Sequence, residues 1–304
     1  MMTVAGKYQA LVRRAGIVLP PLVWLGIFFL LPFLVIAKLS LVDLALARPP
    51  YTPLLDWSGA GWPKWLGDLE NFELLFGDEL YLAAFLGSLK IAAVTTLICL
   101  TVGFPMAYAI ARAAPRLRII LVTAVILPFW TSFLIRVYAW TGLLRDNGII
   151  NGFLMDWGLI DAPIRIINTD TAVYIGTVYT YLPFMILPLF AALEKLDWSL
   201  LEASEDLGAR PWWGFITITL PLALPGIIAG ALLVFIPVTG EFVIPALLGG
   251  PDTLMIGKVL WEEFFNNRDW PVASALAIML VGVLIIPLAF LQNIYTGSAD
   301  GEGR

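Results

Sequence analysis

Residues 222–246 read LALPGIIAGALLVFIPVTGEFVIPA, and Glu241 carries the only charged side chain in this stretch. An α-helix rises 1.5 Å per residue, so about 20 consecutive apolar residues cross the roughly 30 Å hydrocarbon core of a bilayer. Five further apolar runs of comparable length lie at 17–41, 81–111, 119–143, 171–193 and 271–292. The sequence therefore predicts an all-α fold, a polytopic membrane helix bundle with six transmembrane helices.

The composition excludes several classes of function. Of the 304 residues, 60% are hydrophobic and 13% are charged, whereas soluble domains carry about 25% charged residues. The chain has no histidine, which removes histidine acid–base chemistry, Ser-His-Asp triads and histidine metal sites. Its single cysteine, Cys99, forms neither an internal disulfide nor a zinc site, and we interpret it as a packing residue. We expect no catalytic residue, no metal, no cofactor bound by this chain and no nucleic-acid partner.

The charges in the loops predict the orientation of the chain. The N-terminus, 112–118, 194–221 and the C-terminal tail together carry a net charge of +2, and the intervening loops carry −8. Basic residues close to the ends of spans favour the cytoplasmic side. Both termini are therefore predicted to be cytoplasmic, with an N-terminal segment at 1–16, a permease domain at 17–293 and a tail at 294–304. The first run is too long for a cleaved signal peptide, so we expect it to be the first span.

One loop on the predicted cytoplasmic side has clear helix signals. Residues 197–221 read DWSLLEASEDLGARPWWGFITITLP, in which Ser199 and Glu202 have the spacing of a capping box. Gly208 suits the residue of positive φ that ends a helix, and Pro211 suits the first turn of the next helix. The pattern predicts a short helix at about 200–207, a sharp turn, and a second helix that leads into the fifth span.

This loop resembles the EAA loop of ABC-importer permeases. The resemblance rests on Glu202-Ala203-Ser204, Gly208, Ile218 and Leu220-Pro221. It implies a fold like that of type I ABC-importer permeases, with 194–221 as the cytoplasmic coupling loop. Its short helix would dock on the partner ATPase through Glu202, Ala203, Ser204 and Gly208. Other members commonly have a third small apolar residue where Ser204 stands, and serine is small enough to keep that role.

ATP and Mg²⁺ are expected in the partner ATPase. A phosphate-binding loop needs the pattern G-x-x-x-x-G-K-[ST]. The nearest stretch contains Gly257-Lys258, but Val259 follows the lysine and Asp252 occupies the position of the first glycine. This chain is therefore predicted to be a transport subunit and not an enzyme.

The resemblance extends over most of the chain to permeases of polyamine importers, and the putrescine type is the most similar. It is carried by GEFVIPALLGGPD at 240–252, MIGKVLWEEFFNNRDWPVASA at 255–275, ILPFWTSFLIRVYAW at 126–140 and YLPFMILP at 181–188. It implies import of putrescine, or of spermidine, across a bacterial inner membrane. The implied partners are a homologous sister permease, an ATPase dimer, a periplasmic polyamine-binding protein and membrane lipid.

Glu241 is the only acidic residue inside a predicted span. An ionisable group at membrane depth is a functional candidate, because placing it there is costly. We predict that Glu241, Phe242, Trp130 and Tyr138 contribute to the substrate pathway, since carboxylates and aromatic faces attract cations.

Other interpretations of these residues and of the whole chain stay open at this point. Glu241 can instead be a structural partner of Arg136 or Lys90, two basic residues inside predicted spans. Arg136 can also extend its side chain to the membrane interface. Gly240 and Pro245 flank Glu241, so the helix is expected to break there. For the whole chain, the alternatives are a permease for another small solute, an ion-coupled secondary transporter and a membrane-embedded enzyme.

Overall fold

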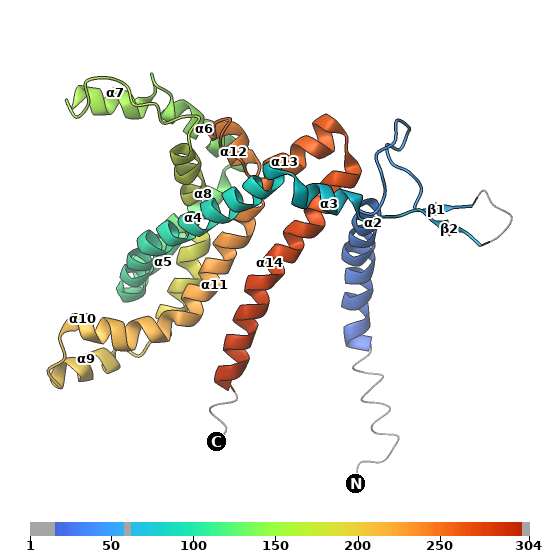
Figure 1. Ribbon diagram of the computed structural model, residues 1–304. Helices are drawn as coiled ribbons and strands as arrows, with labels where there is room; N and C mark the ends of the chain where they lie inside the picture. The colour runs from blue at the N-terminus through green and yellow to red at the C-terminus, as the bar shows by residue number, and fades with distance from the viewer. Residues whose placement is uncertain (1–15, 58–61, 300–304) are drawn as a thin grey trace, which may run out of the picture. The chain divides into compact units, whose positions relative to one another are not determined.

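The computed structural model describes residues 16–57 and 62–299, and the chain forms two compact units. One unit comprises Met1–Glu79 and Leu260–Arg304, and the other comprises Leu80–Val259. Figure 1 traces the chain and labels its elements. The predicted N-terminal segment 1–16 lies outside the described residues except for Gly16, and so does the end of the predicted tail from residue 300.

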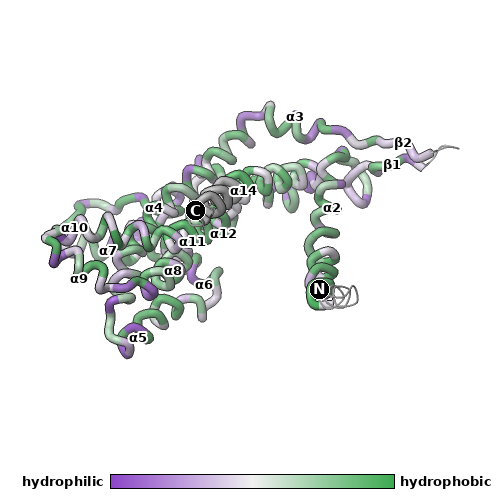
Figure 2. The backbone as a smooth tube through the Cα atoms, turned by 90° about the horizontal axis from the view of Figure 1, so that it is seen from below, coloured by the Kyte–Doolittle hydropathy of each residue, from purple (hydrophilic) through white to green (hydrophobic). Residues whose placement is uncertain are grey.

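The predicted apolar runs form helices. Four helices within the described ranges are long and apolar enough to cross a membrane: Gly16–Leu39, Glu79–Arg112, Asp170–Leu193 and Pro211–Thr239. A bent pair, Pro115–Trp130 and Phe133–Asp156, makes a fifth candidate span if its two helices are counted together. The apolar helix Trp270–Ile286 coincides with the sixth run. Figure 2 shows hydrophobic residues predominating along these helices. The fold class, a helical polytopic membrane bundle, is confirmed.

The first unit combines long helices with a small hairpin. Its described elements are η1 (Gly26–Leu30), α2 (Leu31–Leu39), β1 (Leu55–Asp56), β2 (Lys64–Trp65), α3 (Glu70–Gly77), η4 (Glu262–Asn267) and α14 (Trp270–Ala299). α14 packs against α2 and α3. The antiparallel pair β1–β2 was not predicted, because two-residue strands leave no hydrophobic periodicity to detect. α14 continues beyond residue 293, where the permease domain was predicted to end.

The second unit contains the remaining elements. They are α4 (Glu79–Arg112), α5 (Pro115–Ile126), η2 (Leu127–Trp130), α6 (Phe133–Leu144), α7 (Ile149–Asp156), α8 (Asp170–Leu193), α9 (Ser199–Asp206), α10 (Pro211–Gly214), η3 (Phe215–Thr219), α11 (Leu220–Thr239), α12 (Val243–Leu248) and α13 (Ile256–Trp261), which crosses the boundary between the units.

Small residues allow α8 and α11 to pack closely. Gly226 and Gly230 are four residues apart on α11, and a Cβ at either position would overlap atoms of α8. This is the G-x-x-x-G spacing of close helix pairs in membranes. Cys99 on α4 is fully buried in the same core, as expected of a packing residue.

The third predicted span, 119–143, is not one straight helix. It breaks between Trp130 and Phe133, and its two halves meet at 89°. Pro128 lies in the 3₁₀ turn η2, and both the N–H and the hydroxyl of Thr131 donate to the Pro128 carbonyl, at 3.2 and 2.8 Å. The helix ends here because the backbone of Thr131 is extended, and the two hydrogen bonds close the last turn. Pro128 is the one proline of this run and favours a kink, but the apolar pattern does not show where the helix ends.

The helix of the fifth predicted span begins earlier and ends earlier than the run 222–246. It starts at Pro211 and stops at Thr239. Gly240, Glu241 and Phe242 then connect α11 to α12. The break expected beside Glu241 is therefore present, and it separates a long helix from a helix of six residues.

Candidate functional site

The predicted coupling loop contains the expected short helix, with a different cap. α9 spans Ser199–Asp206, in agreement with the prediction of 200–207. The predicted capping box of Ser199 and Glu202 is wrong, because Ser199 is already inside the helix. Asp197 is the acceptor instead: its Oδ1 receives the backbone N–H of Ser199 at 3.0 Å. Asp197 and Ser199 are both residue types that cap helices, and the one nearer the N-terminus acts here.

Hydrogen bonds from the side chain and the backbone N–H of Ser199 lower the pKa of the Asp197 carboxyl below its ordinary value. The carboxylate is therefore ionised at neutral pH, and it lies beside the positive end of the α9 dipole. This cap therefore keeps its charge to a lower pH than an ordinary aspartate does.

The end of α9 has the predicted geometry. Gly208 has φ +84°. Its N–H donates to the Glu205 carbonyl at 2.8 Å, and the N–H of Ala209 donates to the Ser204 carbonyl at 3.0 Å. These two bonds define a Schellman motif, which a residue with a Cβ forms only under strain. Pro211 occupies the first turn of α10, also as predicted.

The four predicted docking residues do not all face outward. Glu202, Ala203 and Gly208 are exposed, whereas Ser204 is half-buried. The Ser204 hydroxyl donates to the Leu201 carbonyl at 2.8 Å, and a Cβ on Gly214 would lie 3.0 Å from the Ser204 oxygen. Ser204 therefore faces α10, and the missing side chain of Gly214 lets the two helices approach. The large side chain of Leu207 is 89% exposed beside the turn, so this part of the chain presents an accessible apolar surface.

Glu241 lies in the break between α11 and α12, and its carboxylate is enclosed by donors. Only 8% of the residue is exposed. Oε1 accepts the backbone N–H groups of Phe242, Val243 and Ile244 at 3.1, 2.9 and 3.4 Å. Oε2 accepts the hydroxyl of Tyr181 on α8 at 2.5 Å. Glu241 thus caps the N-terminus of α12, where a negative charge is favourable.

The side chain of Tyr181 was missed as a partner of Glu241, because the two are 60 residues apart in the sequence. From Tyr181, ring contacts continue to Phe184 at 6.0 Å between centroids and from Phe184 to Phe129 at 5.2 Å. The guanidinium of Arg136 lies 5.2 Å from the centre of the Phe129 ring. These contacts connect the break beside Glu241 to the elements on both sides of the bend near Thr131.

The proposed pairing of Glu241 with Arg136 or Lys90 is not observed. Within 16–57 and 62–299, the salt bridge that the structure contains joins Arg118 to Glu194. Arg136 stacks on Phe129, and the side chain of Lys90 is exposed.

The backbone of the break is packed against α13. A Cβ at Gly257 would overlap the carbonyl oxygens of Gly240 and Glu241. The glycine that resembled part of a phosphate-binding loop is therefore a helical residue whose missing side chain lets α13 approach the break. Ser88 on α4 supports the same region, because its hydroxyl accepts the N–H of Ile256 at 2.8 Å.

The aromatic pathway candidates have different environments. Phe242 is half-buried at the start of α12. Trp130 is 76% exposed at the end of η2, and Tyr138 is 59% exposed on α6. Tyr138 lines a cavity of about 730 Å³ together with Leu247 and Arg145. Neither Trp130 nor Tyr138 is a hydrogen-bond partner of Glu241 in the described chain. Phe242 therefore adjoins Glu241 at the start of α12, whereas Trp130 and Tyr138 lie on separate elements, η2 and α6.

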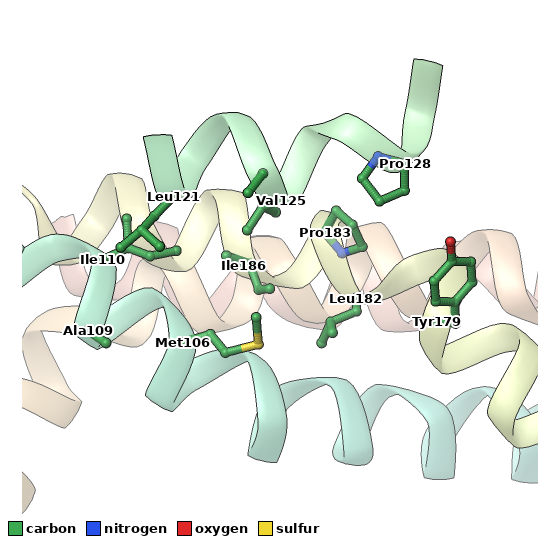
Figure 3. Close-up of a pocket in the computed structure, with 11 residues that line it drawn as sticks. Met106, Ala109, Ile110, Leu121, Val125, Pro128, Tyr179, Leu182, Pro183 and Ile186 are labelled. Atoms are coloured by element: carbon green, nitrogen blue, oxygen red, sulfur yellow. The ribbon is translucent and has the colours of Figure 1, made fainter. Parts of the chain in front are cut away.

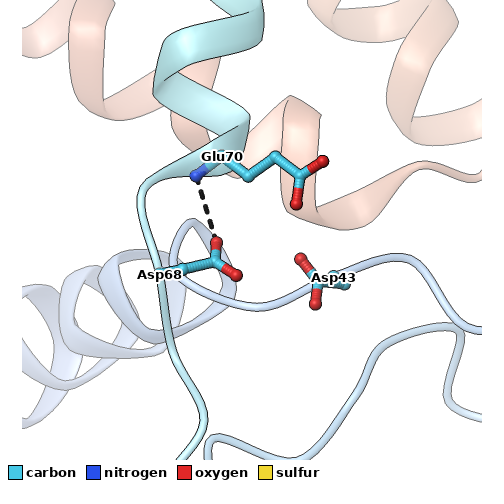
Figure 4. A group of neighbouring side chains, drawn as sticks. All are labelled: Asp43, Asp68 and Glu70. Atoms are coloured by element: carbon cyan, nitrogen blue, oxygen red, sulfur yellow. Dashed lines mark hydrogen bonds between the residues drawn. The ribbon is translucent and has the colours of Figure 1, made fainter.

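Three carboxylates in the first unit have the spacing of possible metal ligands. Oxygen atoms of Asp43, Asp68 and Glu70 lie within 4.8 Å of one another (Figure 4). The carboxylate of Asp68 already accepts the N–H of Glu70 at 3.1 Å, at the start of α3. Asp68 and Glu70 are exposed, and exposed acidic groups commonly occur without an ion. We assign no metal to this cluster.

Comparisons with known proteins agree with this architecture. Residues 100–295 match the family model described as binding-protein-dependent transport system inner membrane component. The chain is 42% identical over 268 residues to the spermidine/putrescine transport system permease protein PotB of Haemophilus influenzae, covering 88% of each protein. It is also 42% identical over 261 residues to PotB of Escherichia coli K12, covering 86% of this chain and 90% of that protein.

A solved structure shares the fold. It is that of a bacterial alginate ABC transporter in complex with an alginate pentasaccharide-bound periplasmic protein. The TM-score is 0.69 with 17% sequence identity, and the match covers 95% of this chain and 96% of the other.

Proposed function

The chain belongs to the family of inner membrane components of binding-protein-dependent transport systems, and from this premise we propose that it is the permease of an ATP-driven polyamine importer. Putrescine is the proposed first cargo and spermidine the second. The family places the chain among multi-pass inner-membrane permeases and not among enzymes. An ion-coupled transporter or a membrane-embedded enzyme has no support from these relatives.

The observation that carries the cargo assignment is the 42% identity over nearly nine-tenths of the chain to permeases named for spermidine and putrescine. The match spans 268 residues, so it includes the segment that holds Glu241 and is not confined to a short motif. A permease for a different small solute is the alternative, and the uptake experiment described at the end of this subsection distinguishes the two.

The chemistry of the second unit suits a cationic cargo. Glu241 supplies a carboxylate in a helix break, where Oε2 has accepted one donor and retains a second lone pair. Phe242, Trp130 and Tyr138 supply aromatic faces, which attract ammonium groups by cation–π interaction. We propose these four residues as contributors to the substrate pathway. Backbone that is irregular at membrane depth is tolerated where it lines a cavity, which is consistent with a pathway beside this break.

The loop 194–221 is the proposed contact with the partner ATPase, in which ATP and Mg²⁺ would bind. Its short helix is stabilised at both ends, by Asp197 and by the Gly208 turn. A rigid element of this kind can transmit a displacement to α11, since α10, η3 and α11 form one continuous helix. Glu202, Ala203 and Gly208 are accessible for the contact, and Ser204 contributes indirectly, because it lies where α9 packs against α10.

The complete importer would contain several further proteins. We propose a homologous sister permease in the membrane, two ATPase subunits on the cytoplasmic side and a periplasmic polyamine-binding protein. The structural neighbour contains a periplasmic protein, which supports that type of partner. Both termini would be cytoplasmic, because the basic residues lie close to the spans on that side.

The proposal is tested by uptake of labelled putrescine in cells that lack this chain, with and without its restoration. Restored uptake that depends on ATP is the expected result, and competition by unlabelled spermidine ranks the two polyamines. Uptake that is indifferent to the chain would overturn the cargo assignment. In that case, restored uptake of another small solute would support the alternative within the same family.

A further inference from the structure

An apolar groove of about 410 Å³ lies on the second unit between α4, α5 and α8. Figure 3 shows its lining, with side chains from three elements directed toward a shared space. The lining residues are Met106, Ala109, Ile110, Leu121, Ala124, Val125, Pro128, Tyr179, Leu182, Pro183 and Ile186. Tyr179 supplies the hydroxyl, and the other ten side chains are apolar. Along α5 and η2 the lining runs from Leu121 to Pro128, a rise of about 10 Å.

The lining does not suit a polyamine. A charged ammonium group in a groove whose side chains offer a single hydroxyl would lose most of its hydration without compensation. The residues of the groove belong to candidate membrane-spanning helices, and both Met106 and Ala109 are exposed at its edge. A groove that opens toward hydrocarbon is filled by an acyl chain or by an apolar side of another protein.

Basic residues at one end of the groove favour the acyl chain of a charged lipid. Arg118 lies one turn before Leu121 on α5, and therefore on the same face of the helix. Its guanidinium joins the three walls: it binds Glu194 after α8 at 2.9 Å and the Ala111 carbonyl on α4 at 2.9 Å. Its Nε is buried without a hydrogen-bond partner.

The charge at this end is positive. Arg112 lies over the rings of Tyr108 and Trp198, at 5.7 and 5.4 Å, and Arg116 is exposed at the start of α5. Glu194 balances one of these three arginines, so an excess of positive charge remains where a lipid phosphate would lie.

We propose that the groove between α4, α5 and α8 binds one acyl chain of an anionic phospholipid, whose phosphate is held by Arg116 beside the Arg118–Glu194 pair. Lipid tails are as apolar as the groove, so the chain fills the space without selecting the lipid. Selection comes from the headgroup, because basic sites beside membrane helices attract anionic lipids. The assignment of this lipid to the cytoplasmic leaflet rests on the orientation given with the proposed function. The binding of the lipid itself does not depend on that orientation.

The test uses the full-length chain in detergent micelles, supplied with phosphatidylglycerol and phosphatidylcholine in equal amounts, and native mass spectrometry of the bound lipid. The wild type should carry phosphatidylglycerol in preference. Arg116→Gln should reduce that preference about fivefold, the effect of removing one basic group near a membrane surface. Ala109→Trp should reduce the binding of both lipids, since it fills the groove.

Matched substitutions control for folding and for general charge. Ala83→Trp is also at an exposed alanine of α4, and Arg165→Gln removes an exposed arginine outside the groove. Both should leave lipid binding unchanged. Undiminished phosphatidylglycerol on Ala109→Trp would overturn the proposal. Equal binding of the two lipids by the wild type would overturn the role of the arginines. Release of a protein subunit by Ala109→Trp in the assembled importer, with lipid unchanged, would assign the groove to a protein contact.

Discussion

The hydroxyl of Tyr181 on α8 donates a 2.5 Å hydrogen bond to Oε2 of Glu241, while Oε1 of the same carboxylate caps α12. The side chain of Glu241 therefore satisfies the N–H groups at the break in the fifth span and connects that break to the fourth span through Tyr181. The pair is also the start of the ring contacts that lead to Phe129 and Arg136 on either side of the bend in the third span.

Tyr181→Phe should destabilise the protein. The substitution keeps the ring and removes the donor, which leaves a buried carboxylate oxygen with one partner fewer. A lost partner of a buried acceptor costs about 1–3 kcal/mol of unfolding free energy. The melting temperature of the purified chain in detergent measures the effect. Tyr174→Phe on the same helix is the control. An equal fall in melting temperature in both variants would show that the hydrogen bond to Glu241 does not stabilise the protein specifically.

Glu241→Gln separates the charge of this residue from its role as a cap. The amide oxygen can still accept the N–H groups of α12, and the NH₂ group can face the oxygen of Tyr181. We expect the unfolding free energy to fall by about 1 kcal/mol, the difference between charged and neutral hydrogen bonds. The KM for putrescine should rise about tenfold if the cargo contacts this carboxylate.

Asp252→Asn removes an exposed acid elsewhere in the second unit and serves as the control. An unchanged KM in Glu241→Gln, with reduced stability, would assign Glu241 to the helix cap alone and remove it from the pathway.

Gly257→Ala should disturb the break directly. The added methyl group would overlap the carbonyl oxygens of Gly240 and Glu241, so α13 or the break has to move. Overpacking of this kind typically costs about 1–3 kcal/mol. Gly282→Ala on α14 is the matched control, because a Cβ there meets no atom within 4 Å. Thermal unfolding of both variants measures the difference in stability. A Gly257→Ala protein as stable as the wild type would contradict the close packing.

Gly208→Ala tests the turn that ends α9. No atom lies within 4 Å of the added Cβ, so the cost arises only from the positive φ of +84°. That conformation costs a residue with a Cβ about 1–2 kcal/mol. We expect weaker ATP-driven transport together with normal membrane insertion, because the strain falls on the proposed coupling helix. Gly152→Ala in α7 is equally unhindered and has no positive φ, so it should have no such effect.

The sequence was sufficient for the features that depend on local pattern. Runs of apolar residues predicted the membrane helices, and Gly208 and Pro211 predicted the turn between α9 and α10. The break beside Glu241 followed from Gly240 and Pro245. These predictions hold because helix termini and membrane spans are encoded within a few neighbouring residues.

The features that depend on distant contacts were not accessible. Nothing near Glu241 in the sequence points to Tyr181, and the choice between Asp197 and Ser199 as the cap depended on where α9 begins. Pro128 favours a kink in the third apolar run, but it does not specify the 89° bend near Thr131. The inward position of Ser204 required the packing of α9 against α10, which the motif alone does not contain.

The most direct test of the central claim is putrescine accumulation in proteoliposomes that contain the complete importer, with this chain as wild type, Glu202→Ala or Glu205→Ala. Both residues are exposed acids on α9, and only Glu202 belongs to the proposed contact with the ATPase. We predict ATP-dependent accumulation by the wild type and by Glu205→Ala, and ATP hydrolysis without accumulation by Glu202→Ala. Accumulation by Glu202→Ala at the wild-type rate would contradict the coupling role of α9, and absence of ATP-dependent accumulation by the wild type would contradict polyamine import.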